Sequence, residues 1–112
     1  MDETNRAREA EGLDPLPLSE CAARAGRHRA AELVGQALEH APLKDVIADC
    51  APHGRAAENL VDSEAAPAAV VEAWLDSPGH RSNVLAPDMT AMGIGCVEHT
   101  GGMLCSQIFV GP

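Results

Sequence analysis

The stretch that decides the fold reads Trp74-Leu75-Asp76-Ser77-Pro78-Gly79-His80-Arg81-Ser82-Asn83-Val84-Leu85. The apolar residues leading into it fall on one helical face, and Pro67 suits the first turn of that helix. Pro78 and Gly79 predict that the helix stops near Ser77. We therefore expect a helix over residues 67–77, followed by a tight polar turn that presents the imidazole of His80.

A hairpin is predicted after this turn. Residues 90–97 and 103–110 alternate well enough to form two strands, and His99-Thr100-Gly101-Gly102 supplies the turn between them. Met92, Ile94 and Cys96 share one face of the first strand, with Gly93 and Gly95 between them. Glycine inside a strand often marks the close approach of another element, so we expect one to pack there.

The four cysteines allow three pairings. If the turn centres on Thr100-Gly101, Cys96 and Cys105 lie directly opposite each other, at the short separation that a disulfide needs. That pairing leaves Cys21 with Cys50, and two bridges indicate an oxidising compartment. Four buried free thiols remain the alternative. A zinc site is disfavoured because no Cys-x-x-Cys spacing occurs.

The first half of the chain is predicted to be mainly helical. We expect helices over residues 2–11, 19–38 and 43–48, a loop over 13–17 because two prolines break any helix there, and an irregular segment over 49–57. With the hairpin, this pattern indicates an α+β fold in which helices pack on a small antiparallel sheet, as one domain over residues 1–112.

The net charge of the chain and the shortness of its apolar runs argue against nucleic-acid binding and against a membrane span. The formal net charge is −9, so nucleic acid is not expected as a partner, because phosphate binding needs clustered Lys and Arg. Most of the basic residues lie between Arg6 and Arg29, where we expect a solvated helix face. No apolar run approaches the roughly 20 residues of a membrane span. The opening residues do not read as a secretory signal, so we expect either a cytosolic protein or a mature fragment cut from a longer precursor. We expect a monomer.

These segments resemble the CAP superfamily (cysteine-rich secretory, antigen 5 and pathogenesis-related 1 proteins, also called the SCP domain), in its bacterial branch. The resemblance covers almost the whole chain, in this order: Asn5-Arg6 through Gly12-Leu13-Asp14-Pro15-Leu16, His40-Ala41-Pro42-Leu43, Glu58-Asn59-Leu60, the Trp74 to Leu85 stretch, Met92-Gly93-Ile94-Gly95-Cys96 and Cys105-Ser106-Gln107-Ile108-Phe109. It implies an α-β-α sandwich with a central antiparallel sheet, a surface cleft and a location outside the cell or on its surface.

The resemblance also implies a cleft of histidines and acidic residues that can hold a divalent metal. His40 and Glu58 correspond to family positions, whereas His80 matches the bacterial motif only. Glu72 lies near the region where the family carries the second acidic residue of its cleft. This chain departs from the family signature at Ala57, where glycine is usual, and it lacks the His-Tyr-Thr-Gln type segment of eukaryotic members.

Three roles for this cluster follow. Two imidazoles and a carboxylate suit Zn²⁺ or another divalent cation, so His40, His80 and Glu58 are candidate ligands. Glu58 is also a candidate general base and a candidate anchor for backbone hydrogen bonds. Arg81 and Asn83 are expected to brace the His80 turn by hydrogen bonds, with contact to a ligand as the alternative. Glu72 is expected on a solvated helix face, and Asn59 belongs to the same cleft motif.

The sequence favours a binding domain over an enzyme, because no nucleophile lies on a suitable turn and the cysteines are expected in disulfides. We expect a secreted or surface-exposed domain that binds a lipid, a small ligand or a protein through the cleft between the Glu58 region and the His80 turn, with an optional divalent metal. A metal-dependent hydrolase using the same cleft is the alternative. In a third reading, the polar cluster only braces the fold.

Overall fold

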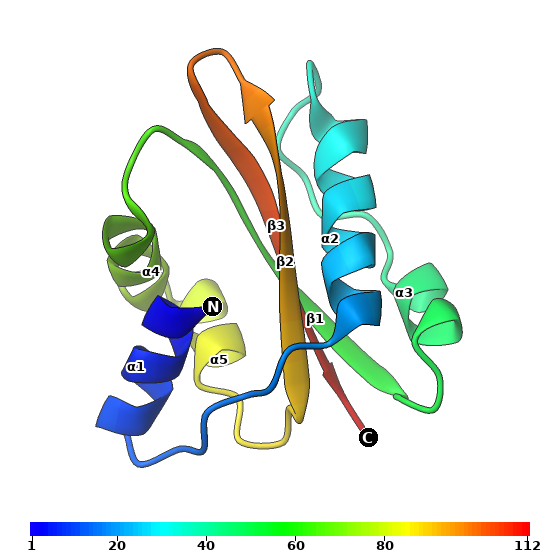
Figure 1. Cartoon of the computed structure of the whole chain (residues 1–112), viewed down its shortest axis with the longest axis vertical. Helices are drawn as coiled ribbons and strands as arrows, with labels where there is room; N and C mark the ends of the chain where they lie inside the picture. The colour runs from blue at the N-terminus through cyan, green and yellow to red at the C-terminus, as the bar shows by residue number, and fades with distance from the viewer.

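The computed structural model describes all residues, 1–112, and consists of one sheet between two layers of helices (Figure 1). Helices α2 and α3 cover one face, and α1, α4 and α5 cover the other. The elements in chain order are α1 (Asp2–Ala10), α2 (Glu20–Leu33), α3 (Lys44–Asp49), β1 (Arg55–Ser63), α4 (Pro67–Leu75), α5 (Pro78–Val84), β2 (Ala91–His99) and β3 (Gly102–Gly111). This arrangement confirms the predicted α+β, α-β-α sandwich.

The sheet has the order β1-β3-β2, and both pairings are antiparallel. Strand β3 is central and buried along most of its length. Its even-numbered side chains from Leu104 to Val110 face α2 and α3, and the odd-numbered ones face the other layer, because successive residues of a strand point to opposite faces. Ile108 accordingly packs with Val46 of α3, and Phe109 with Trp74 of α4.

The hairpin forms with the predicted register. Cys96 lies opposite Cys105 in the β2–β3 ladder, and their sulfurs form a disulfide. Thr100 and Gly101 connect the strands with φ of 45° and 84°, as a two-residue turn with left-handed residues requires. The second predicted disulfide, Cys21–Cys50, is also confirmed, and no cysteine is free.

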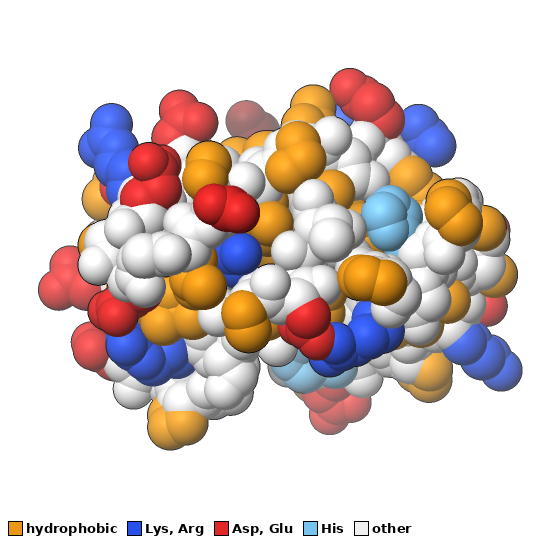
Figure 2. Space-filling view, turned by 90° about the horizontal axis from the view of Figure 1, so that it is seen from below, with side chains coloured by type: hydrophobic (Ala, Val, Ile, Leu, Met, Phe, Trp, Pro, Cys, Tyr) orange, Lys and Arg blue, Asp and Glu red, His pale blue; other side chains and the backbone are white.

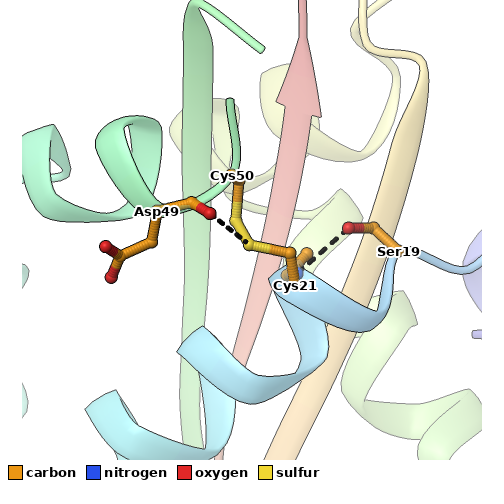
Figure 3. Close-up of a disulfide and its surroundings, with 5 residues drawn as sticks. Ser19, Cys21, Asp49 and Cys50 are labelled. Atoms are coloured by element: carbon orange, nitrogen blue, oxygen red, sulfur yellow. Dashed lines mark hydrogen bonds between the residues drawn. A yellow bond between two sulfur atoms is a disulfide. The ribbon is translucent and has the colours of Figure 1, made fainter. Parts of the chain in front are cut away.

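The Cys21–Cys50 bridge ties the first turn of α2 to the end of α3 (Figure 3). The α2 helix starts beside it, where the side chain of Ser19 accepts a hydrogen bond from the backbone N–H of Ala22, as predicted for this N-cap. The bridge therefore holds α3 against the α2 face of the sheet, next to the site described below.

Helix α2 approaches β2 at backbone distance, as the glycines of β2 predict. A Cβ at Gly93 would overlap the backbone of Ala23, and a Cβ at Gly95 would overlap that of Arg27. A Cβ at Gly26 of α2 would in turn lie 2.5 Å from the carbonyl oxygen of Ser106. Glycine on both sides of this contact lets α2 lie directly on the sheet.

Three predicted boundaries are wrong. The segment expected as a turn after Ser77 is the helix α5, because proline also favours the first turn of a helix and Pro78 begins one here. Residues 55–57, expected to be irregular, are the first part of β1. Helix α2 ends at Leu33 rather than near residue 38, and the exposed chain turns through Gly35 at φ 78°.

The basic residues of the first third are not all on a solvated face. Arg8 is 2% exposed, and its guanidinium donates to the backbone carbonyls of Asp14, Val84 and Ala86. Burial lowers the pKa of Arg8, and the charge of Asp14 opposes that shift. Arg8 thus fastens α1 to the chain that leaves α5. None of the helices has the length and apolar content to cross a membrane.

Candidate functional site

The carboxylate of Glu58 is the centre of the one buried ionic cluster. Glu58 lies in the middle of β1, and its side chain, 1% exposed, faces α2. Its Oε2 accepts hydrogen bonds from Nε of Arg29 at 2.5 Å and from Oγ of Ser106 at 2.6 Å. Its Oε1 lies 3.1 Å from Nη2 of Arg29 and 2.9 Å from Nδ1 of His40. Both oxygens are therefore fully engaged by protein groups.

These contacts keep Glu58 ionised. Burial alone would raise the pKa of Glu58, but hydrogen bonds from Arg29, Ser106 and His40, together with the charge of Arg29, lower it below its usual value. A carboxylate held this way is a weak proton acceptor. The arrangement thus favours an anchoring role for Glu58 over the role of a general base poised near neutral pH.

Arg29 extends the cluster to the chain that follows α2. Its Nη2 donates to the carbonyl of Ala41 at 2.7 Å, and its Nη1 to that of Pro42 at 3.3 Å. The side chain of Arg29 is 11% exposed, whereas that of His40 is 55% exposed. Arg29 and Glu58 together hold this loop in place, so that the His40 imidazole sits at the surface with one nitrogen fixed.

A second polar group lies on the other side of β1. Asn59, the residue after Glu58, points to the opposite face and is completely buried. Its Oδ1 accepts from Nδ2 of Asn83, which also reaches the backbone carbonyl of Glu58 at 3.0 Å, and its Nδ2 donates to the carbonyl of His80 at 3.3 Å. These bonds dock α5 onto β1. Asn59 and Asn83 thus brace α5 against the sheet.

The structure brings only some of the predicted site residues together. His40 and Glu58 are in direct contact on the α2 face of the sheet. The backbone carbonyl of His80 is bound by Asn59, which points to the opposite face, so His80 lies on that opposite face. Arg81 is exposed, and its Nη2 lies 3.6 Å from Oε1 of Glu11. Glu72 is exposed on α4. The expected cleft between the Glu58 region and the His80 turn is therefore wrong, because the sheet itself separates them.

The donor set does not fit the divalent metal that the family resemblance implies. No group of three His, Cys, Asp or Glu side chains is close enough to hold a metal ion. Of the candidate ligands, only His40 and Glu58 meet, and the Glu58 carboxylate is also bound by Arg29. The N–H groups of Arg29 occupy lone pairs of the carboxylate, and its positive charge repels a cation. Arg29 thus fills the place at Glu58 that a metal would need.

Two hollows open beside Arg29. The larger, about 600 Å³, lies between α2 and α3 and is lined by Cys21, Arg24, Ala25, His28, Arg29, Glu32, Asp45, Val46, Ala48 and Asp49. The smaller, about 120 Å³, is lined by Arg29, Glu32, Leu33, Glu39 and Ala41. We call the larger hollow the α2–α3 groove.

On the underside of the molecule, basic and acidic side chains are interspersed and no continuous basic surface appears (Figure 2).

Arg29 and Ser106 were missed by the sequence analysis. Each lies on a stripe that faces the sheet or the α2 layer: Arg29 follows Ala22 and Gly26 along α2, and Ser106 alternates with Leu104 and Ile108. An arginine next to a small-residue stripe was the available signal, because a buried carboxylate requires a cation or several donors, but Arg24 and Arg27 lie on the same helix. Nothing local joins that arginine to a glutamate 29 residues away.

Comparison with known proteins gives consistent matches. A model of the cysteine-rich secretory protein family, CAP, matches residues 1–110. YkwD of Bacillus subtilis (strain 168), an uncharacterized protein, is 30% identical over 115 residues, which cover 96% of this chain and 44% of YkwD. The chain thus spans less than half the length of this curated relative.

Solved structures share the fold. An extracellular protein containing an SCP domain from Bacillus anthracis matches with a TM-score of 0.79 at 22% identity, over 97% of this chain and 38% of that one. An outer surface protein of Borrelia burgdorferi matches with a TM-score of 0.80 at 18% identity, over 98% and 86%. A cysteine-rich secretory protein of Staphylococcus aureus matches with a TM-score of 0.79 at 22% identity, over 99% and 37%.

Proposed function

Because this chain belongs to the cysteine-rich secretory protein (CAP) family, we propose that it is a binding domain that acts outside the cell and not an enzyme. The observation that carries the proposal is the state of Glu58, whose two oxygens accept four hydrogen bonds from Arg29, His40 and Ser106. Such a carboxylate organises its surroundings and has no free lone pair directed at a ligand.

The available nucleophiles also support a binding role. Ser106 is buried and its hydroxyl donates to Glu58, and the hydroxyl of Ser82 donates to the carbonyl of Pro78. All four cysteines are in disulfides, so none supplies a thiolate. A metal-activated water would need His40 and His80 on the same side of the sheet. The hydrolase alternative therefore has no supporting geometry.

We place the binding surface at the α2–α3 groove. Its α2 wall carries Arg24, His28, Arg29 and the acidic Glu32, and its α3 wall carries Asp45 and Asp49. The apolar part of the lining consists mainly of short side chains, which offer little surface to an acyl chain. A polar small ligand or a protein segment that carries both charges fits this lining better than a lipid does.

A peptide-binding experiment tests the groove. Immobilised peptides with mixed, purely acidic or purely basic charge are incubated with the protein, alongside vesicles of neutral lipid. We expect binding to mixed-charge peptides, weakened by Asp45→Lys and unaffected by Glu9→Lys, which makes the same charge change at an exposed position of α1. Equal loss in both variants, or binding to the vesicles alone, would overturn the proposed surface.

Location outside the cell rests on two further observations. The chain contains two disulfides, which form and persist in oxidising compartments. One structural relative is described as extracellular and another as an outer surface protein. We propose that this domain is likewise secreted or surface-exposed, and that it works as a monomer.

A further inference from the structure

The outward backbone groups on the two edge strands of the sheet, β1 and β2, differ in how many of them are hydrogen bonded. On the outer edge of β1, the carbonyl of Glu58 accepts from Nδ2 of Asn83 at 3.0 Å, and the carbonyl of Leu60 accepts from Nε1 of Trp74 at 3.1 Å. Side chains from α4 and α5 thus occupy the backbone acceptors that an added strand would need. This edge is blocked to further pairing around residues 58–60.

The outer edge of β2 is occupied only at its beginning. The N–H of Met92 donates to the carbonyl of Pro17 at 3.0 Å, and the N–H of Ser19 donates to the carbonyl of Met92 at 2.8 Å, as a parallel bridge centred on Leu18. The chain then enters α2 and leaves the edge. In Figure 1 the connection between α1 and α2 crosses only the lower end of β2.

The rest of that edge is unpaired. Because Met92 directs its backbone groups away from β3, the residues two, four and six positions on, Ile94, Cys96 and Glu98, direct theirs the same way. No hydrogen bond joins the backbone N–H or carbonyl of these three residues to the loops or side chains around them. None of the three is fully buried. Residues 94–98 therefore present an alternating row of free donors and acceptors.

We propose that residues 94–98 accept an extended segment of a partner protein as a fourth strand, next to the bridge that Pro17–Ser19 already makes. Main-chain hydrogen bonds would supply affinity, and the side chains that border the edge would supply selectivity. Ile94 and Cys96 offer a half-buried apolar border, and Glu98 is exposed at the far end. The segment is an apolar, extended peptide with a basic residue near Glu98.

Charge separates this occupant from a second copy of the chain. A net charge of −9 repels another copy and attracts a basic segment. Antiparallel pairing of β2 with itself around Cys96 would set Glu98 opposite Ile94 of the copy, which gives the carboxylate no basic partner. The edge thus matches a basic peptide better than it matches itself.

Amide exchange on the free protein provides the first test. We expect the N–H groups of Ile94, Cys96 and Glu98 to exchange quickly with deuterium, and those of Gly93, Gly95 and Val97, which bond to β3, to exchange slowly. Protection of all six in the free monomer would show that the edge is already covered and would overturn the proposal.

The second test adds a probe, a short synthetic peptide of alternating Thr and Val with Lys at both ends. We expect saturable shifts and new protection confined to the amides of Ile94, Cys96 and Glu98. A peptide with alternate nitrogens methylated should not bind, and Glu98→Lys should bind a few-fold more weakly than Glu9→Lys, the charge-matched control. No saturable binding, binding unaffected by N-methylation, or protection by self-association without peptide would each overturn the proposal.

Discussion

The guanidinium of Arg29 and the carboxylate of Glu58 meet at two points, Nε to Oε2 at 2.5 Å and Nη2 to Oε1 at 3.1 Å, and so join helix α2 to strand β1. Neither group is much exposed, at 11% for the Arg29 side chain and 1% for that of Glu58. Arg29→Met should destabilise the protein by about 3–5 kcal/mol, because it leaves a buried carboxylate without its cation. Urea unfolding measures this loss.

A double variant separates the charge from the packing. Arg29→Met combined with Glu58→Gln removes both charges, so it should be more stable than Arg29→Met alone. If the two variants unfold at the same urea concentration, the pair does not act as an ion pair in the folded protein.

Acid should weaken the protein partly through Glu58. The pKa of Glu58 is lower in the folded protein than its usual value of 4.5, so the unfolded chain binds this proton first as the pH falls. The stabilising contribution is complete above the usual pKa and is lost as the pH falls through the lower, folded value. The difference in unfolding free energy between the wild type and Glu58→Gln should shrink over that range. A difference that stays constant with pH would contradict the assignment.

Zinc should not join the two histidines of the predicted ligand set. His40 contacts Glu58 on the α2 face of β1, while the α5 backbone at His80 is bound by Asn59 on the opposite face. In an NMR titration that follows the histidine ring nitrogens, we expect no joint, saturable shift of His40 and His80 with Zn²⁺ at low micromolar concentration. A joint shift would mean that the chain rearranges to assemble the site.

The parts of the structure that the sequence predicted are those set by short-range geometry. The register of Cys96 against Cys105 follows from the turn at Thr100-Gly101, and the close approach of α2 follows from Gly93 and Gly95. Each depends on residues within one element or one hairpin. The pairing of Cys21 with Cys50 then followed by elimination.

The site was only partly predictable because it depends on long-range contacts. Glu58 is joined to Arg29 across 29 positions and to Ser106 across 48, and no local pattern encodes either contact. Which face His80 occupies depends on whether α5 packs against Glu58 or Asn59, and neighbouring strand residues point to opposite sides. Helix α5 itself was missed because Pro78 both ends one helix and begins the next.

The glycine contact between α2 and β2 predicts a sharp difference between two similar substitutions. Gly95→Ala should destabilise the protein by about 1–3 kcal/mol or more, since the new methyl would overlap the backbone of Arg27 and Gly26. Gly79→Ala is the control, because a Cβ there meets nothing within 4 Å. Alanine in α5 should be neutral or stabilise by about 0.4–1 kcal/mol. Thermal unfolding measures both variants. Equal melting temperatures would show that α2 can shift away from the sheet at little cost in free energy.

The two disulfides should contribute unequally. Cys21–Cys50 closes a separation of 29 residues and Cys96–Cys105 one of 9. In the loop-entropy model, the longer loop corresponds to about 3.5 kcal/mol and the shorter to about 2.5 kcal/mol. The Cys21→Ala/Cys50→Ala double variant should therefore lose more stability in urea than Cys96→Ala/Cys105→Ala, whose strands remain paired by the ladder. The longer bridge also holds α3 against α2, so its loss should loosen the α2–α3 groove and weaken peptide binding there. The reverse order of stability would show that the hairpin bridge constrains more of the chain than its own loop.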